Sequence, residues 1–437
     1  MATLIQARAD AVSTGGPSRA VAYSWVVFAF AFGLLISDYM ARQVLNAVFP
    51  LLKAEWSLSD GQLGLLAGVV ALMVALLTIP FSILADRLGR VKSLTVMAIL
   101  WSLATLFCAV AQNYGQMLFG RVLVGVGEAA YGSVGIALVI SVFPHRMRAT
   151  LSAAFMAGGL FGHVFGVAAA GEIAASQGWR AAFLAIGLVG LAIALLFPFV
   201  VTERRVATLG GNPPRTAEPR GGAPKRPRLP LKALFASRSL VLAYVGSGLQ
   251  LFSGGALPAW IPTFLNRYHH LPVDQAGQLA AILFLVCAAG MILCGMASDR
   301  LSRDRPERKI TLAVAYCIAT AVALTIAMQC PPGMAQLAVL AVAMFFSSGS
   351  TGPTGAMVAN LTPLAIHGTA FATLTLINNL LGFAPGPIAT GWIADKVGLL
   401  GAFRLLPVVC VFAALAFFLA RKTYLADLTK VSGGSAE

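Results

Sequence analysis

Charged residues are scarce in this sequence. Only 11% of the 437 residues are Asp, Glu, Lys or Arg, whereas 58% are hydrophobic. A soluble domain carries about 25% charged residues, so this chain has too few to cover the surface of a soluble enzyme. Acidic residues are scarcer still, 16 against 31 basic ones, which gives a net charge of +15. A basic excess raises nucleic-acid binding as an option, but the apolar excess argues against it.

The sequence also lacks paired cysteines and an apolar run at its beginning. Its cysteines show no regular spacing, so we expect neither a disulfide framework nor a metal site. They are Cys108, Cys287, Cys294, Cys317, Cys330 and Cys410. The first 20 residues contain no apolar stretch, so we expect no cleaved secretory signal.

Long apolar segments make up most of the chain. A helix needs about 20 apolar residues to cross a bilayer, and the sequence offers twelve such segments. They are 22–49, 61–85, 91–111, 115–142, 149–173, 180–201, 239–265, 275–298, 308–329, 334–361, 368–393 and 400–421. Membrane-spanning strands alternate in polarity and close into a barrel, which these solidly apolar runs do not match. The predicted fold class is therefore an all-α membrane protein.

One long hydrophilic segment, rich in Pro, Gly and Arg, divides these helices six and six. We expect it to be a disordered tether. The predicted organisation is a cytoplasmic tail (1–20), an N-terminal six-helix bundle (21–201), a basic cytoplasmic linker (202–237), a C-terminal six-helix bundle (238–422) and a second cytoplasmic tail (423–437).

Basic residues are distributed unevenly around the twelve segments. With a cytoplasmic N-terminus, 24 Lys and Arg lie in cytoplasmic segments, 5 lie in outer segments and 2 lie within helices. Because basic residues accumulate on the cytoplasmic side, we expect both termini in the cytoplasm and the chain in the inner (plasma) membrane. The outer segments are balanced between basic and acidic residues: Lys53, Arg180, Arg267, Lys396 and Arg404 against Glu55, Asp60, Glu172, Asp274 and Asp395.

The two halves of the chain resemble each other. The pair Asp86-Arg87 follows the second segment and recurs 213 residues later as Asp299-Arg300, after the eighth. Residues 144–150 likewise match 363–369 at an offset of 219. Together with the division into six and six helices, these repeats predict duplication of a six-helix unit.

The sequence Asp86-Arg87-Leu88-Gly89-Arg90 resembles the signature loop of the major facilitator superfamily, Gly-x-x-x-Asp-Arg-x-Gly-Arg, with Ser82 in place of the first Gly. The resemblance covers about residues 21–422. It implies twelve transmembrane helices in two pseudo-symmetric bundles and transport by alternating access. It also implies a cytoplasmic gate in which Asp86 pairs across the halves, while Arg87 and Arg90 order the loop. The expected gate residues are Asp86, Arg87, Gly89, Arg90, Asp299 and Arg300.

Four ionisable residues fall inside the predicted helices, where a charge is costly and usually functional. Asp38 and Arg42 are spaced i,i+4 in the first helix, and Arg121 and Glu128 are spaced i,i+7 in the fourth, so each pair shares one helix face. Their charges sum to zero. A salt-bridge staple between the helices would also explain them. However, Glu128 maps to Ser347 at the offset of 219, so the second half lacks a counterpart.

The same positions resemble motifs of two groups within that superfamily, the anion:cation symporters and the Spinster-like transporters. Residues 121–131 resemble their helix-four motif, and residues 38–43 resemble their helix-one motif, commonly Asn-Tyr-x-Asp-Arg. This sequence has Ala41 at the usual Asp position, and Asp38 stands at the Asn position. The resemblance therefore implies proton coupling by Glu128, with Asp38 as the second candidate.

We predict a secondary active transporter in which a proton on Glu128 or Asp38 releases an arginine, Arg42 or Arg121, to bind an organic anion such as a carboxylate or sugar acid. The alternative is proton-linked export of a lysolipid-like or drug-like amphiphile. The expected partners are an anionic small molecule and the lipid bilayer, without nucleic acid, and the chain is expected to be monomeric. The proton is the coupling ion and no other cofactor is expected. No nucleophile–base pair, metal cluster or nucleotide loop indicates an enzyme.

Further polar and aromatic residues are candidates for lining a substrate cavity. His163 stands where proton antiporters of the superfamily often have Pro, and packing between helices is its second interpretation. Polar side chains within a membrane also join helices, so each candidate has that alternative. Besides His163, the candidates are Gln250, Trp260, Ser347, Asn378 and Asn379.

Overall fold

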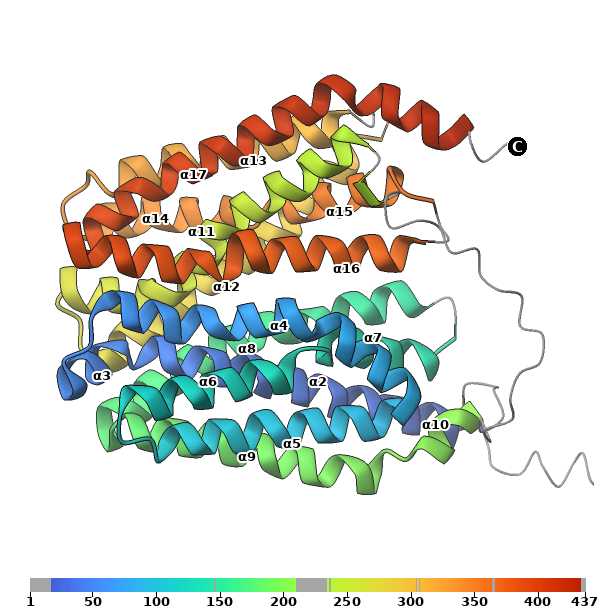
Figure 1. Cartoon of the computed structure of the whole chain (residues 1–437), viewed down its shortest axis with the longest axis horizontal. Helices are drawn as coiled ribbons and strands as arrows, with labels where there is room; N and C mark the ends of the chain where they lie inside the picture. The colour runs from blue at the N-terminus through green and yellow to red at the C-terminus, as the bar shows by residue number, and fades with distance from the viewer. Residues whose placement is uncertain are drawn as a thin grey trace, which may run out of the picture.

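The structure is a computed structural model that describes residues 17–144, 147–209, 234–235, 237–303, 305, 307–363 and 366–433. Within these ranges every regular element is helical. Figure 1 shows the helices running side by side in two groups, the N-terminal half in blue to green and the C-terminal half in yellow-green to red. The predicted all-α fold class is confirmed.

The N-terminal half contains six helical spans and one short helix between the first two. The first turn of the second span is stabilised by a capping box, in which Ser59 and Gln62 each accept a hydrogen bond from the other's backbone N–H. The elements are α2 (Pro17–Ala47), α3 (Phe49–Trp56), α4 (Asp60–Leu88), α5 (Arg90–Ala109), α6 (Tyr114–Glu128) with α7 (Tyr131–Ser141), α8 (Arg148–Gln177) and α9 (Trp179–Val200).

The C-terminal half repeats this order. Its elements are α11 (Arg238–Tyr268), α12 (Val273–Leu301), α13 (Arg308–Ala327), α14 (Met334–Ser347) with α15 (Thr351–Asn360), α16 (His367–Asn378), the short π-helix η4 (Asn379–Phe383) and α17 (Pro385–Gly433). In both halves the fourth span consists of two helices, α6 and α7 in the first and α14 and α15 in the second.

Eleven helical runs of the described residues are long and apolar enough to cross a membrane, against the twelve expected. The difference arises in the last run, His367–Thr429, whose 63 residues are about three times what a bilayer requires. Gly398 lies inside α17 with φ 77° and ψ 162°, a left-handed conformation that glycine adopts without strain. The chain turns back at this point (Figure 1), so the run contains two spans.

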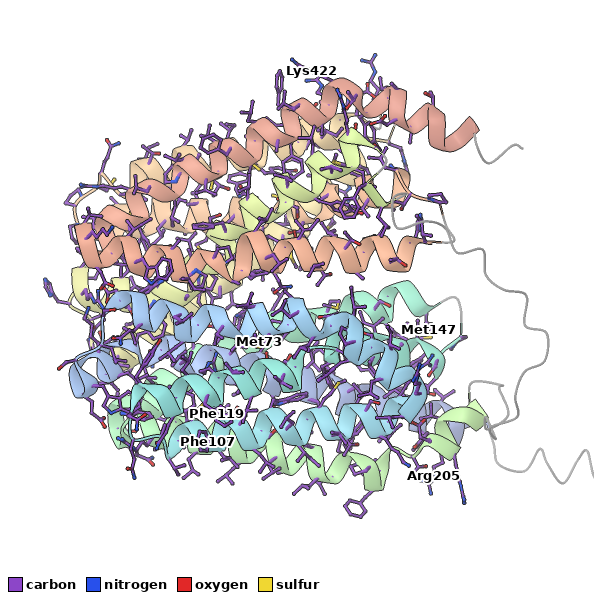
Figure 2. The ribbon with its side chains drawn as sticks, viewed as in Figure 1. Met73, Phe107, Phe119, Met147, Arg205 and Lys422 are labelled. Carbon is purple, nitrogen blue, oxygen red and sulfur yellow. The ribbon has the colours of Figure 1, made fainter. Side chains whose placement is uncertain are left out.

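Large apolar side chains are exposed along the flanks of the helices. Phe107 and Phe119, labelled in Figure 2, are 36% and 55% exposed, and Phe199 is 82% exposed. A soluble protein does not expose so extended an apolar surface. The chain is a multi-pass membrane protein, with these side chains facing lipid.

The first part of the predicted tether is helical. Glu203–Leu209 forms α10, and Glu203 Oε1 accepts a hydrogen bond of 2.7 Å from the backbone N–H of Val91 at the start of α5. A carboxylate at a helix N-terminus is favourable because the first amides have no partner within the helix. The predicted tether runs to residue 237, and residues 210–233, most of its remainder, lie outside the described residues.

The two halves meet most closely at the end opposite α10, where the ribbons of α4 and α17 converge (Figure 1). Gly64 of α4 lies against the carbonyl of Pro387 in α17. On the other side of the interface, Gly171 of α8 and Gly277 of α12 are so close that a Cβ on Gly277 would lie 3.3 Å from Gly171 Cα. Missing side chains therefore allow the two backbones to approach each other.

Candidate functional site

The fourth span of each half is broken at an equivalent residue. α6 ends at Glu128, and α14 ends at Ser347, 219 residues later. This is the offset at which the sequence maps one residue onto the other. In the first half the break frees the carbonyl of Ala129, which accepts a hydrogen bond of 2.6 Å from Thr78 Oγ1 of α4. Glu128 is thus the last residue of α6, and a carbonyl freed at this helix end accepts a hydrogen bond from α4.

Glu128 forms an ion pair with Arg42 of α2. Arg42 Nε lies 2.7 Å from Glu128 Oε2, and the Glu128 side chain is completely buried, whereas that of Arg42 is 23% exposed. The contact is close but is not aligned as a hydrogen bond, since both atoms lack a hydrogen-bond partner. The pair is therefore held by charge rather than by a fork of aligned hydrogen bonds.

Asp38 completes this cluster one helical turn from Arg42. It is 3% exposed and lies close enough to Glu128 and Arg42 to interact electrostatically with both. Asp38 Oδ1 and Glu128 Oε1 have no partner among the described residues. Two carboxyl groups can form a hydrogen bond with each other only when one of them carries a proton. The geometry therefore provides a site at which a proton can be shared.

Arg121, the other arginine expected to bind an anion, is held by backbone carbonyls. Its guanidinium donates hydrogen bonds to backbone carbonyls, at 2.9 Å to Ala41, at 3.3 Å to Leu66 and at 3.5 Å to Arg42, and the residue is 1% exposed. Glu128 follows it by seven residues, a rise of about 10 Å along a helix, which is too far for a direct pair. The structure therefore pairs Glu128 with Arg42 and leaves Arg121 bound to the backbone of α2 and α4.

A row of polar side chains continues from Arg42 along α2. Arg42 lies 5.2 Å from the ring of Tyr39, and that ring lies 4.9 Å from the ring of His163 on α8. Gln43 Nε2 contacts His163 Nδ1, and Asn46 Nδ2 donates to Gln43 Oε1 at 2.9 Å. Gln43 and Asn46 were not among the site residues predicted from the sequence. The spacing of Asp38, Arg42 and Asn46, four residues each, was the signal that would have placed Asn46 on their face.

Across the interface, the predicted cavity residues of the C-terminal half are largely bonded within that half. The His163 ring lies 6.2 Å from the ring of Phe284 on α12. Gln250 Nε2 donates to Thr320 Oγ1 at 3.2 Å and to the Ser347 carbonyl at 3.1 Å. Ser347 Oγ in turn donates to its own helix, at the carbonyl of Met344.

Trp260, Asn378 and Asn379 lie in different surroundings. Trp260 is completely buried at the end opposite α10, where Nε1 donates to the Pro387 carbonyl at 3.1 Å. Asn379 begins the π-helix η4 and donates to the Thr375 carbonyl at 2.9 Å. Asn378 is half-buried and its buried Oδ1 has no partner among the described residues. π-helical turns occur frequently at functional sites, and of these three residues Asn378 is the one with a buried acceptor that lacks a partner among the described residues.

The predicted gate residues lie at the end that carries α10. Arg90 Nη1 donates to the Ala137 carbonyl at 3.1 Å, and Gly89, with φ 97°, lies against Glu203. In the second half, Asp299 pairs with Lys309 at 2.9 Å. The side chains of Arg87 and Arg300 are exposed. The prediction for the Asp86 side chain falls outside the described part of the structure.

Comparison with known proteins identifies the family. The sequence profile of the Major Facilitator Superfamily matches residues 31–384, and the chain belongs to this superfamily. The probable L-galactonate transporter of Escherichia coli (strain K12) is 26% identical over 388 residues, which cover 86% of this chain and 83% of that protein. Protein spinster homolog 1 of Mus musculus is 28% identical over 388 residues, covering 82% of this chain and 71% of that protein. The predicted membership of the superfamily and similarity to the Spinster-like group are thereby confirmed.

A solved structure shares the fold. The crystal structure of a bacterial homolog of the human lysosomal transporter Spinster, in an inward-facing and unoccupied conformation, matches with a TM-score of 0.80 at 23% sequence identity. The match covers 93% of this chain and 98% of that one. The predicted arrangement of two six-helix bundles is therefore confirmed as the major facilitator fold.

Proposed function

We propose that this chain is a proton-coupled symporter of an organic anion, a carboxylate or sugar acid, that works by alternating access in the inner (plasma) membrane. Both termini and the linker lie in the cytoplasm in this proposal, so the end that carries α10 is the inner end. The observation that carries the proposal is the buried ion pair of Arg42 and Glu128 with the carboxyl group of Asp38 beside it.

The coupling follows from the cost of changing the buried charge. A substrate carboxylate that binds the Arg42 guanidinium takes the place of the Glu128 carboxylate and adds one negative charge to the cluster. Extra charge in a membrane interior costs several kcal/mol, and a proton on Glu128 or Asp38 cancels it. One proton therefore accompanies each carboxylate group of the substrate, and neither ion enters the buried cluster efficiently alone.

The planar guanidinium of Arg42 favours a carboxylate as the ligand. Guanidinium binds a carboxylate through two parallel hydrogen bonds, and Arg42 is the partly exposed member of the ion pair, so an incoming anion can reach it. Gln43, Asn46 and His163 add amide and imidazole groups beside it, which suit the hydroxyl groups of a sugar acid. The name of the relative from Escherichia coli, a probable L-galactonate transporter, supports the same class.

Export of a lysolipid-like or drug-like amphiphile is the second candidate. It is favoured by the similarity to protein spinster homolog 1 and by the apolar ring of Phe284 opposite His163. An amphiphile with a negative head group would use the same arginine, and its tail would lie against apolar side chains of the interface. The two candidates differ in whether the transported molecule is water-soluble.

Uptake into proteoliposomes separates them. We expect a labelled sugar acid or monocarboxylate to accumulate under an inward proton gradient and accumulation to stop when the gradient is collapsed. In Glu128→Gln, which mimics the protonated carboxyl group, gradient-driven accumulation should be lost while exchange of labelled for unlabelled substrate continues. Glu55→Gln, in an ion pair far from the cluster, is the matched control and should accumulate substrate normally. Gradient-dependent movement of lysolipids alone would replace the symport proposal by the export one.

A further inference from the structure

Four of the ten charged residues in the outer segments come together between the two halves. Arg267, in the last turn of α11, binds Asp60, the first residue of α4, through two hydrogen bonds of 2.7 Å, from Nη1 to Oδ2 and from Nη2 to Oδ1. Lys53 Nζ adds a contact of 2.6 Å to Asp60 Oδ1. A forked pair of this kind fixes the orientation of both partners as well as their distance.

The fourth member, Asp395, caps α4 from the opposite half. Its Oδ1 accepts the backbone N–H of Asp60 at 2.7 Å, and its Oδ2 accepts that of Gly61 at 2.8 Å. The next amide, that of Gln62, is bonded by Ser59 Oγ of the same half at 3.1 Å. The amides of Asp60 and Gly61 are therefore satisfied only while α17 stays in place, since helix-end amides have no partner within the helix.

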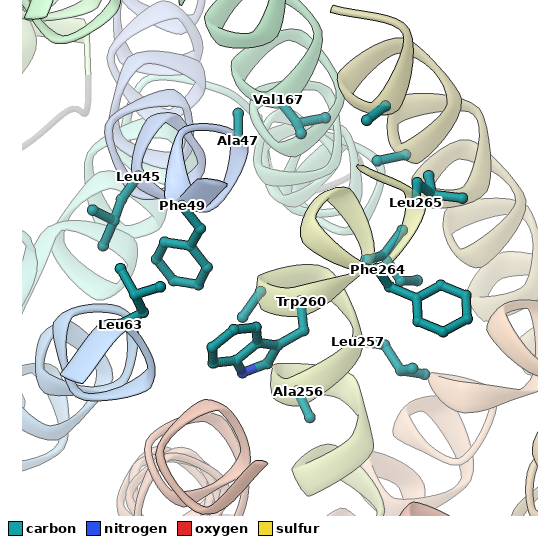
Figure 3. Packing of buried hydrophobic residues seen from close by; sticks show 14 of the residues in the cluster. Leu45, Ala47, Phe49, Leu63, Val167, Ala256, Leu257, Trp260, Phe264 and Leu265 are labelled. Carbon is teal, nitrogen blue, oxygen red and sulfur yellow. The ribbon is translucent and has the colours of Figure 1, made fainter. Parts of the chain in front are cut away.

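The network is tightly packed. The Asp60 side chain is 5% exposed and that of Arg267 is 25% exposed, so separation of the halves would remove the forked Arg267 partner from a nearly buried carboxylate and leave it only Lys53. A Cβ on Gly61 would lie 2.9 Å from Asp395 Oδ2, which leaves no room for any other residue. Next to the network, the rings of Phe49 and Trp260 face each other across the interface (Figure 3). Their centroids lie 5.0 Å apart.

The hydrogen bonds recorded between described residues of the two halves all lie at this end. Two of them join Arg267 to the Asp60 carboxylate, and two join Asp395 to the amides of Asp60 and Gly61. The fifth runs from Gln278 Nε2 to Glu172 Oε2 at 3.1 Å. Glu172 and Gln278 belong to α8 and α12, on the other side of the same end. Figure 1 shows the two groups of helices diverging toward the end that carries α10.

We propose that Asp60, Arg267 and Asp395 form an outer latch, which holds the outer ends together while the cavity faces the cytoplasm and must break each time the outer side opens. Its charges balance, with Asp60 and Asp395 against Lys53 and Arg267, so closing it buries no net charge. The inference rests on the proposed orientation of the chain and is independent of the substrate. The latch would stabilise the closed outer end, as the signature loop is expected to stabilise the closed inner end.

The test measures the separation of the outer ends in detergent without substrate. Spin labels are introduced as non-canonical amino acids at Gln112 and Ala335, exposed positions in the outer segments of the two halves, so that the six native cysteines remain. Pulsed electron paramagnetic resonance then reports the distribution of distances. We expect Asp60→Asn and Asp395→Asn each to raise the ratio of the long-distance to the short-distance population roughly fivefold or more. Arg267→Gln should have the same effect and serves if an Asp60 variant does not fold.

Glu55→Gln is the matched control, because it removes an outer carboxylate that pairs with Arg180 within one half. Its distance distribution should equal that of the unmodified chain. Distributions that stay unchanged in Asp60→Asn, Asp395→Asn and Arg267→Gln would overturn the latch. The readout is separate from the proposed transport chemistry, since a latch would give the same shift in a transporter of uncharged substrates.

Discussion

Glu128 and Ser347 are equivalent residues of two duplicated halves, each the last residue before a break in the fourth span. The break in the helix is repeated in both halves, but the ionisable side chain is present only in the first. Glu128 is an acid paired with Arg42, whereas the Ser347 hydroxyl is bonded to its own helix and its carbonyl to Gln250. Duplication thus supplied two broken helices, and in the proposed mechanism only the first half was adapted to carry a proton.

Arg42→Lys should weaken anion binding while leaving the protein folded. Lysine keeps the charge but loses the forked geometry that matches a carboxylate, so we expect the KM for the acid to rise about tenfold, the equivalent of one charge-assisted hydrogen bond. Initial rates of uptake at a fixed proton gradient measure it. Arg180→Lys, which alters an ion pair with Glu55, is the control. An unchanged KM in Arg42→Lys would exclude Arg42 as the anion site.

Arg121→Lys should instead lower stability. The three carbonyls that the guanidinium binds would lose most of their donors, and we expect the free energy of unfolding to fall by about 2 kcal/mol. Thermal unfolding in detergent, followed by intrinsic fluorescence, measures the change. The same measurement on Arg42→Lys should show a much smaller shift. If Arg121→Lys raised KM with no change in thermal stability, Arg121 would be a substrate ligand after all.

Gly64→Ala should disturb the seal between α4 and α17. A Cβ at this position would collide with the Pro387 carbonyl, which is backbone and cannot turn aside. We expect the halves to be forced apart at the outer end and the rate of transport to fall at least tenfold, an effect of about 1.4 kcal/mol. Gly132→Ala is the control, since a Cβ there has no neighbour within 4 Å. Equal rates in the two variants would show that the contact of Gly64 is not needed.

Acid should weaken the attachment of α3 to α9. The indole N–H of Trp179 donates to Glu55 Oε2 at 2.5 Å, and this bond, with the Arg180 guanidinium, holds the pKa of Glu55 below its ordinary value. The folded protein therefore favours the ionised form, and the stabilisation is complete above the ordinary glutamate pKa of about 4.3. It is lost as the pH falls through the lower pKa of the folded state. We expect Glu55→Gln to flatten the decline of the thermal midpoint in that window, and a decline identical to that of the unmodified chain would exclude Glu55 as its cause.

The spans and the intramembrane charges could be predicted from the sequence, because both depend on residue type alone. Solid apolar runs identify helices that cross a bilayer, and a charge within one is costly wherever it points. The partner of Glu128 could not be predicted in the same way. A helix that is apolar all round gives no indication of its rotation, so nothing in the sequence shows that Arg42 of another helix turns toward that carboxyl group.

The outer network was hidden for a different reason. The sequence shows only that the outer segments contain equal numbers of basic and acidic residues, among them Lys53, Asp60, Arg267 and Asp395. Asp60 and Arg267 are 207 residues apart, and their meeting depends on how the two bundles dock, which no local pattern encodes. The helix at Glu203–Leu209 was missed because its stabilising contact, the amide of Val91, lies 112 residues earlier.

The hydrogen bonds of Arg121 have a mechanical consequence. One guanidinium on α6 binds backbone carbonyls of both α2 and α4 beside Arg42. It therefore restrains these three helices against moving relative to one another. In the proposed mechanism, the acids and the arginine beside them therefore belong to one rigid group of helices, which can tilt as a whole without disturbing the residues that carry the proton. Access to these residues would then depend on the tilt of the C-terminal half, which would open the interface at one end or the other. The geometry of the proton site would stay the same in both states.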